Sequence, residues 1–220
     1  MSKFKFTHLV AGLGAAFLLG GPACATIVGG AITLAIDNGI NVTATAAFVK
    51  LSVPLTGSTP ANTVGQDNFG SKNLFGFDES QNILLGAPLV MDQGGPVAAG
   101  TQVASHYVFF DPAVSGRVVG TVDFDSDILG IMTSTGLLAA SDFLVNTGVN
   151  YLNPGLRGLE PGDTVSFSGR TISLDFSAGS PGDYIRVITA FSPGAVPEPG
   201  SLALVGLALA GAGLARRRCG

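Results

Sequence analysis

The sequence predicts an all-β protein, an antiparallel β-sandwich or jelly roll, flanked by an N-terminal signal helix and a short hydrophobic C-terminal helix. Two observations favour the sandwich. Short apolar runs in the middle of the chain are separated by Gly, Pro, Asn and Asp, and none of comparable length has helical periodicity. Seven or more short strands divided by such turn residues are typical of antiparallel sandwiches.

Apolar segments at the two ends divide the 220-residue chain into three parts. In residues 1–25, two lysines precede an apolar stretch that is followed by the small residues Ala23 and Ala25. This is the pattern of a secretory signal peptide, so we expect signal peptidase to cut after Ala25. Residues 26–194 then form the β-sandwich ectodomain, and residues 195–220 form a separate C-terminal segment.

Both cysteines of the chain, Cys24 and Cys219, fall in these terminal segments. Lipid attachment at Cys24 is not expected, because Gly21 stands where a lipoprotein signal has a bulky aliphatic residue. The ectodomain therefore has no disulfide and needs a full hydrophobic core, which roughly 170 residues suffice to build.

The expected strands follow from the apolar runs between turn residues, at 32–36, 42–51, 102–110, 117–124, 164–168, 171–176 and 184–191. One helical turn is expected at 141–144, with Ser141 as its cap. Residues 54–80 are rich in Gly, Asn, Ser and Thr. They form either an ordered loop held by its phenylalanines or a mobile excursion.

The stretch DTVSFSGRTISLDF, residues 163–176, predicts a hairpin with a two-residue II′ turn at Gly169 and Arg170. This register sets Phe167 opposite Ile172 and Val165 opposite Leu174. All the large apolar side chains of the hairpin then share one face.

The run DYIRVITAF, residues 183–191, is apolar on both faces and predicts a central strand. Arg186 on this strand is then partly buried and needs a carboxylate partner, because an unpaired buried charge is costly. Asp175, Glu160 and Asp163 are the expected candidates.

The ectodomain is acidic. Between residues 26 and 196 there are six Lys and Arg and fourteen Asp and Glu, which gives a net charge of −8. Nucleic acid and anionic lipid are therefore not expected as partners.

Few residues point to catalysis, and no cofactor is expected. His106 is the one histidine outside the signal peptide, and it alternates with Val108 and Phe110 on a strand, as a hydrogen-bonded histidine in the core or at its rim does. No nucleophile elbow, phosphate-binding loop or cysteine nucleophile is present in residues 26–194. A hydrolase would need a cleft that joins His106 to carboxylates.

A metal site is not expected either. Asp123, Asp125 and Asp127 resemble the opening of a calcium loop, but Ile128 and Ser134 stand where its glycine and bidentate glutamate belong. These aspartates remain candidates only for an irregular calcium site. Glycan stacking has little support, because the chain has no tryptophan and three tyrosines.

The C-terminal segment combines Pro197, Glu198 and Pro199 with an apolar run at 202–215 and a basic cluster of Arg216, Arg217 and Arg218. The apolar run makes a helix of about 21 Å, shorter than the roughly 30 Å hydrocarbon core, and is a marginal anchor. The arginines favour the cytoplasmic side, which leaves the domain outside.

This order of motif, apolar run and basic cluster resembles the PEP-CTERM sorting signal of exopolysaccharide-producing Gram-negative bacteria. The resemblance implies recognition by an exosortase, a membrane-embedded cysteine transpeptidase that cuts near the motif and releases or re-anchors the protein outside the inner membrane. The segments SHYVFFDP, GLRGLEPGD and GDYIRVITAF are similar to β-rich choice-of-anchor ectodomains, which have no established catalytic residues.

We therefore expect an exported, non-enzymatic surface or matrix protein. Signal peptidase and exosortase are its expected processing partners, the inner membrane a transient one, and exopolysaccharide a further one. The expected destination is the cell surface or the extracellular space. The alternatives are a glycan- or calcium-binding module and, third, an extracellular hydrolase.

Overall fold

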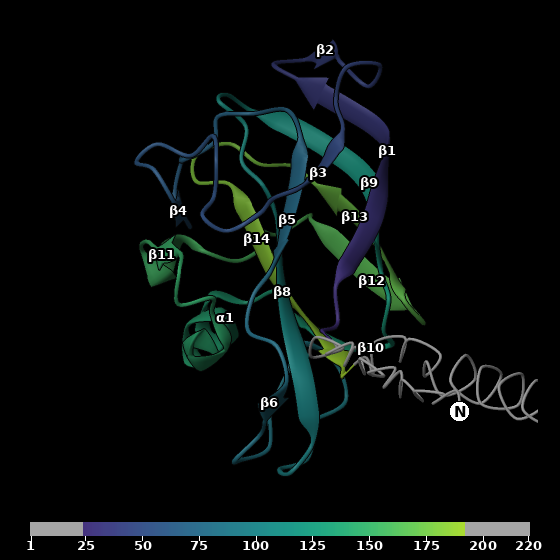
Figure 1. Ribbon diagram of the computed structural model, residues 1–220. Coiled ribbons are helices and arrows are strands. Elements are labelled where there is room, and N and C mark those ends of the chain that lie inside the picture. The colour runs from purple at the N-terminus through teal and green to yellow at the C-terminus, as the bar shows by residue number, and fades with distance from the viewer. Residues whose placement is uncertain (1–23, 192–220) are drawn as a thin grey trace, which may run out of the picture. The chain divides into compact units, whose positions relative to one another are not determined.

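The computed structural model describes residues 24–191. The expected signal helix, Ala23, the hydrophobic C-terminal helix, the Pro-Glu-Pro motif and the basic cluster lie outside these residues. Within them, two mostly antiparallel β-sheets pack face to face (Figure 1). The predicted all-β sandwich is confirmed.

The smaller sheet, which we call the outer sheet, has five antiparallel strands. Their order is β12 (Thr164–Ser168), β13 (Thr171–Phe176), β9 (Gly116–Phe124), β1 (Ile27–Asp37) and β2 (Ile40–Asn41).

The larger sheet, which we call the central sheet, has seven strands. Six follow one another as β3 (Phe48–Lys50), β5 (Leu74–Asp78), β8 (Gln102–Phe110), β14 (Asp183–Ala190), β10 (Ile128–Met132) and β7 (Gln93–Gly94), and β6 (Ile83–Leu84) pairs with β8. The pairing of β3 with β5 is parallel, which departs from the expected antiparallel pattern at this edge. The strand expected to be central, β14, lies between β8 and β10.

The central sheet is covered on both faces, by the outer sheet on one side and by irregular segments on the other (Figure 1). We call these segments, residues 51–69, 85–92 and 133–151, the loop layer. They carry a parallel pair, β4 (Thr63–Val64) with β11 (Asn150–Tyr151), and the helices α1 (Thr135–Ala140) and η1 (Asp142–Leu144). A further 3₁₀ turn, η2, spans Pro154–Leu156.

Strand β14 shows how one sequence serves two cores. Ile185 and Val187 belong to the apolar cluster between the two sheets. Tyr184 and Ile188 belong to the cluster under the loop layer, and Arg186 has the same parity as these two. Both faces are buried, as the apolar run predicted.

The hairpin of β12 and β13 has the predicted register. Val165 pairs with Leu174 and Phe167 with Ile172. Gly169 has a φ of +58°, whereas Arg170 is not among the residues with positive φ, and this combination fits a II′ turn.

The expected strand at 42–51 is wrong over its first half. Residues 42–46 form a turn in which the N–H groups of Thr45 and Ala46 donate to the Val42 carbonyl at 2.9 and 3.0 Å. The Thr43 hydroxyl accepts the Ala35 N–H at 2.8 Å, so a side chain takes the place of a strand partner. Only Phe48–Lys50 is a strand.

The helical turn at 141–144 is present as η1, but Ser141 does not cap it with its side chain. The Ser141 hydroxyl donates instead to the carbonyls of Leu137 and Leu138, at 2.7 and 3.1 Å. Helix α1 was not expected, because six residues are too few to show helical periodicity.

Residues 54–80 follow the first of the two alternatives, an ordered segment held by phenylalanines. The Phe69 ring lies 4.8 Å from that of Phe75 and 4.9 Å from that of Phe109. The Asp111 carboxylate accepts the N–H groups of Asn68 and Phe69 at 2.8 and 3.0 Å. The segment is therefore bound to the central sheet by apolar and polar contacts.

Candidate functional site

Arg186 is fully buried, and its main partner is Glu79. Its Nε and Nη2 atoms donate to the two Glu79 carboxylate oxygens at 2.7 and 3.0 Å. None of the three expected candidates, Glu160, Asp163 and Asp175, takes this position. Glu79 follows β5, at the end of the segment whose structure the sequence left open.

A group of polar side chains closes around this ion pair. Glu79 also accepts hydrogen bonds from the hydroxyls of Ser105 and Tyr151, at 2.5 and 2.7 Å. Arg186 donates to the Ser141 hydroxyl at 2.5 Å and to a backbone carbonyl of α1 at 2.9 Å. We call these five residues the Arg186 cluster. It uses most of the hydrogen-bonding capacity of both charges, as buried ion pairs require.

The electrostatics agree with this geometry. Burial alone would lower the pKa of Arg186, but the charge of Glu79 and its hydrogen bonds outweigh burial and raise that pKa. The guanidinium carbon lies 5.6 Å from the centre of the Tyr107 ring, which adds a cation–π contact. Arg186 is therefore a permanent buried cation that joins the central sheet to the loop layer.

Arg157, directly after η2, forms a second buried ion pair next to the Arg186 cluster. It is buried, and its two terminal nitrogens donate to the Asp142 carboxylate at 2.9 and 2.6 Å. Its guanidinium carbon lies 5.9 Å from the centre of the Tyr151 ring. The hydroxyl of Thr135, at the start of α1, donates to the Arg157 carbonyl at 2.6 Å. These contacts hold α1 and η1 in place.

His106 is fully buried, as expected for a core histidine. Its Nδ1 lies 2.8 Å from Asp78 Oδ1, its Nε2 lies 3.0 Å from the Thr189 hydroxyl, and its ring packs 5.0 Å from that of Phe124. Burial alone would raise the pKa of Asp78, but the hydrogen bond and charge of His106 outweigh burial. With Lys50 they hold that pKa well below its ordinary value. Both ring nitrogens are therefore engaged inside the fold.

Each of the three candidate calcium ligands, Asp123, Asp125 and Asp127, binds a different group of the protein. Thr171 donates to Asp123 at 2.6 Å, and Arg170 pairs with Asp127 at 3.0 Å. Asp125 accepts a backbone N–H at the start of β1. In the part of the chain that the structure describes, no three His, Cys, Asp or Glu side chains are arranged to hold a metal ion. The geometry gives calcium no support at these aspartates.

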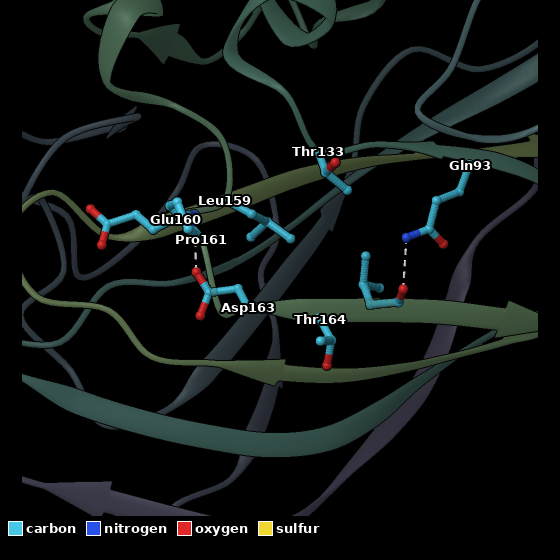
Figure 2. Close-up of a pocket in the computed structure, with 8 residues that line it drawn as sticks. Gln93, Thr133, Leu159, Glu160, Pro161, Asp163 and Thr164 are labelled. Atoms are coloured by element: carbon cyan, nitrogen blue, oxygen red, sulfur yellow. Dashed lines mark hydrogen bonds between the residues drawn. The ribbon is translucent and has the colours of Figure 1, made fainter.

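A polar hollow with a volume of about 400 Å³ lies beside the start of β12 (Figure 2). Its lining includes Gln93, Thr133, Glu160, Asp163 and Thr164. The Asp163 carboxylate accepts the Glu160 N–H at 3.0 Å, and Gln93 donates to a backbone carbonyl of β12 at 2.7 Å. Figure 2 shows the Glu160 carboxylate directed away from Gln93 and Thr164. The hollow is large enough for a small ligand, but no aromatic ring lines it.

Asp183, at the start of β14, is a buried carboxylate that was not among the predicted site residues. It is 1% exposed, and its Oδ2 has no hydrogen-bond partner within residues 24–191. Burial, together with the negative charges of Asp163 and Glu160, raises its pKa to about 8. The alternation along β14 could have predicted this burial, because Asp183 lies on the same face of the strand as the apolar residues 185 and 187.

Comparison with known proteins bears on the C-terminal segment. Residues 195–218 match the family model described as the PEP-CTERM protein-sorting motif. This range contains the Pro-Glu-Pro motif at 197–199 and the arginines at 216–218. No curated protein and no solved structure matches the chain.

The fold and the motif together define a class: an exported β-sandwich protein with a C-terminal sorting signal. More particularly, the chain carries a PEP-CTERM sorting motif, whose processing partner is an exosortase. Within residues 24–191, no helix is both long and apolar enough to span a bilayer. The expected hydrophobic helix at 202–215 lies outside that range.

Proposed function

We propose that the mature protein is a non-enzymatic component of the cell surface or extracellular matrix. Signal peptidase removes residues 1–25 during export, and an exosortase then processes the C-terminal segment near Pro197, Glu198 and Pro199. The domain contacts the inner membrane only transiently, through its tail, and associates with exopolysaccharide at its destination. The sorting motif at residues 195–218 is the observation that carries this proposal.

The use of the polar side chains in the ectodomain supports a role without catalysis. A catalytic histidine must come within hydrogen-bond reach of its substrate. His106 is fully buried with both ring nitrogens engaged, and Arg186 and Glu79 are buried against each other. These groups stabilise the fold, and none of them faces a cleft as a hydrolase would require.

Replacement of Glu198 by alanine tests the sorting step. If exosortase reads this motif, the variant remains full length in the inner-membrane fraction, while the wild-type protein is recovered outside without its tail. Glu160→Ala is the matched control, because Glu160 also precedes a proline but lies in a turn of the ectodomain. Wild-type protein found full length in the inner membrane, with Cys219 detectable by mass spectrometry, would show that the tail is a plain anchor.

A binding module is the second candidate, and the hollow beside β12 is the observation that favours it. Its lining includes two acidic side chains and two threonines, Thr133 and Thr164, that could contact a polar ligand. Calorimetric titration with calcium and a glycan array, each run on the wild type and on Glu160→Gln, measure this directly. If the wild type binds calcium or a glycan and Glu160→Gln does not, the protein is a ligand-binding module and the proposed structural role is wrong.

A further inference from the structure

The first residue expected in the mature chain, Thr26, is held by a carboxylate through its backbone nitrogen. The Thr26 N–H donates to Asp125 Oδ1 at 2.8 Å, and the Asp125 N–H donates to the Thr26 carbonyl at 3.0 Å. The Ser126 hydroxyl donates to the same Asp125 oxygen at 3.2 Å. The backbone hydrogen bond between Asp125 and Thr26 therefore positions the Asp125 carboxylate next to the Thr26 nitrogen.

A second carboxylate holds the same stretch of chain from the central sheet. Asp78 accepts the Thr26 hydroxyl at 2.6 Å and the Ile27 N–H at 2.9 Å. Lys50 pairs with Asp78 at 2.7 Å, donates to the Ile27 carbonyl at 2.7 Å and contacts the Thr26 hydroxyl. Asp78 is also the partner of His106. We call Thr26, Lys50, Asp78, His106 and Asp125 the N-terminal cluster, and it joins the central sheet to the outer sheet.

We infer that signal peptide removal completes the N-terminal cluster, because the new α-ammonium group of Thr26 binds Asp125 as a structural ion pair. Hydrolysis adds water across the Ala25–Thr26 amide. It leaves a carboxylate on Ala25, which departs with the signal peptide, and an amine on Thr26, which takes up a proton. The inference rests on the proposed export and on cleavage after Ala25.

The charges of the cluster favour this assignment. Before cleavage, Lys50 and His106 both contact Asp78. Within residues 24–191, the side-chain hydrogen bonds of Asp125 come from neutral donors alone, the Thr26 N–H and the Ser126 hydroxyl. After cleavage, each carboxylate has its own cation. The ammonium of Lys50 repels the new one, but Lys50 contacts Asp78 directly and reaches Thr26 only through the hydroxyl. Because Coulomb energy falls with distance, the direct contact with Asp125 dominates.

A charged donor also makes a stronger bond than the amide it replaces. The amide N–H already donates to an ionised acceptor, and the ammonium adds a full positive charge at the same short distance, so the Coulomb attraction to Asp125 increases. A chain that begins one or two residues earlier keeps an amide at Thr26 and places its ammonium elsewhere. The position of the signal peptidase cut therefore decides whether the ion pair with Asp125 can form.

The protein recovered from its exporting host provides the test. Edman sequencing first establishes the N-terminus, and the rate of acylation of the α-amine is then measured against pH. An ion pair with Asp125 raises the α-amino pKa above its ordinary 7.7–8.0. A rise of about one unit slows labelling at pH 7 by about tenfold. Asp125→Asn should restore the ordinary rate, and Asp127→Asn, whose partner is the exposed Arg170, should leave the slow rate unchanged.

A second variant carries one glycine inserted between Ala25 and Thr26, so that cleavage leaves an amide at Thr26 and an ammonium one residue away. This variant should label at the ordinary rate, and its thermal stability should no longer fall between pH 8 and 10 as that of the wild type does. The wild type loses stability over this range because the pKa of its α-amine is higher in the folded than in the unfolded state. The ion pair stabilises the fold fully below the unfolded pKa, and this stabilisation is lost as the pH rises through the folded pKa.

Equal labelling rates for the wild type, Asp125→Asn and the glycine-extended protein would overturn the inference. An N-terminus other than Thr26 would overturn it as well, without touching the sorting role. That role fails on a separate result, the recovery of full-length wild-type protein from the inner membrane.

Discussion

The two faces of the central sheet are packed by different means. On the face toward the outer sheet, the buried cluster consists of apolar side chains, and strand β14 contributes Ile185 and Val187. On the face toward the loop layer, the same strand contributes Arg186, whose charge is met by Glu79. The first face is held mainly by apolar contacts, although it also contains the buried side chains of His106 and Asp183. The second face is held by aromatic rings and a buried ion pair.

The difference follows from what covers each face. A β-sheet satisfies its own backbone hydrogen bonds, so two sheets can pack mainly through apolar side chains. Irregular segments leave backbone N–H and C=O groups without a ladder partner. In this protein, side chains supply those partners. Arg186 donates to a carbonyl of α1, and Asp111 accepts the N–H groups of Asn68 and Phe69. Buried polar side chains thus substitute for regular secondary structure.

Arg186→Ala should have the largest effect, because it leaves Glu79 buried without its cation. We expect a loss of about 3 kcal/mol in the free energy of unfolding, measured by urea denaturation. Arg170→Ala is the control, since the pair of Arg170 with Asp127 is exposed and contributes less than about 0.5 kcal/mol. Equal midpoints for the two variants would show that the charged face is no more sensitive than the surface.

Asp183→Asn tests the one carboxylate that β14 places on the apolar face, and it should stabilise the protein. Because the folded pKa of Asp183 is raised to about 8, folding binds a proton above the unfolded pKa of about 3.9. The contribution of Asp183 to stability therefore falls as pH rises from about 4 to about 8 and then levels off. At pH 9 we expect the variant to gain about 2 kcal/mol.

Thermal melts across this pH range measure the effect of Asp183. Asp127→Asn, at an exposed carboxylate, provides the control and should keep the wild-type slope. A variant at 183 that keeps the same slope would place the titrating group elsewhere.

Ile185→Val should lower the free energy of unfolding by about 1 kcal/mol, because it removes one methylene from the close-packed layer between the sheets. The loss should be the same at pH 5 and pH 8, since the surrounding cluster is apolar. A pH-dependent loss would contradict the distinction between the two faces.

Asp92→Asn should have the smallest effect. Its carboxylate accepts the N–H groups of Thr133 and Ser134 at 2.6 and 2.7 Å, in the connection that leads into α1. Burial would raise the pKa of Asp92, but these backbone hydrogen bonds lower it. The site is open to solvent, so we expect a loss of about 0.5 kcal/mol at pH 7. This loss should disappear as the pH falls through the folded pKa, and an unchanged difference in acid would exclude the carboxylate as its source.

Local patterns determined how much of the fold could be predicted. The hairpin register followed from alternation on both sides of a two-residue turn, and the central place of β14 followed from its two apolar faces. The turn at 42–46 was missed because a side chain, Thr43, replaces a backbone partner. Alternation along a strand contains no information about such a substitution.

The candidate site was harder to predict, because its contacts join distant parts of the chain. Arg186 was expected to be buried and paired, but Glu79 lies 107 residues away. The pairing depends on the loop layer, whose segments have neither helical nor strand periodicity. The sorting motif, in contrast, is contiguous, and its order of residues was sufficient to identify it.

The position of β14 also determines when this domain can fold. Among the strands of residues 24–191 it comes last in the sequence, yet it lies between β8 and β10, which pair with β14 and not with each other. A chain that leaves the cell N-terminus first therefore exports its central strand last. Until residues 183–190 emerge, two open edges face solvent, and such edges are prone to wrong pairing. The sorting motif follows β14 in the sequence, so export of the motif comes only after every strand of the two sheets.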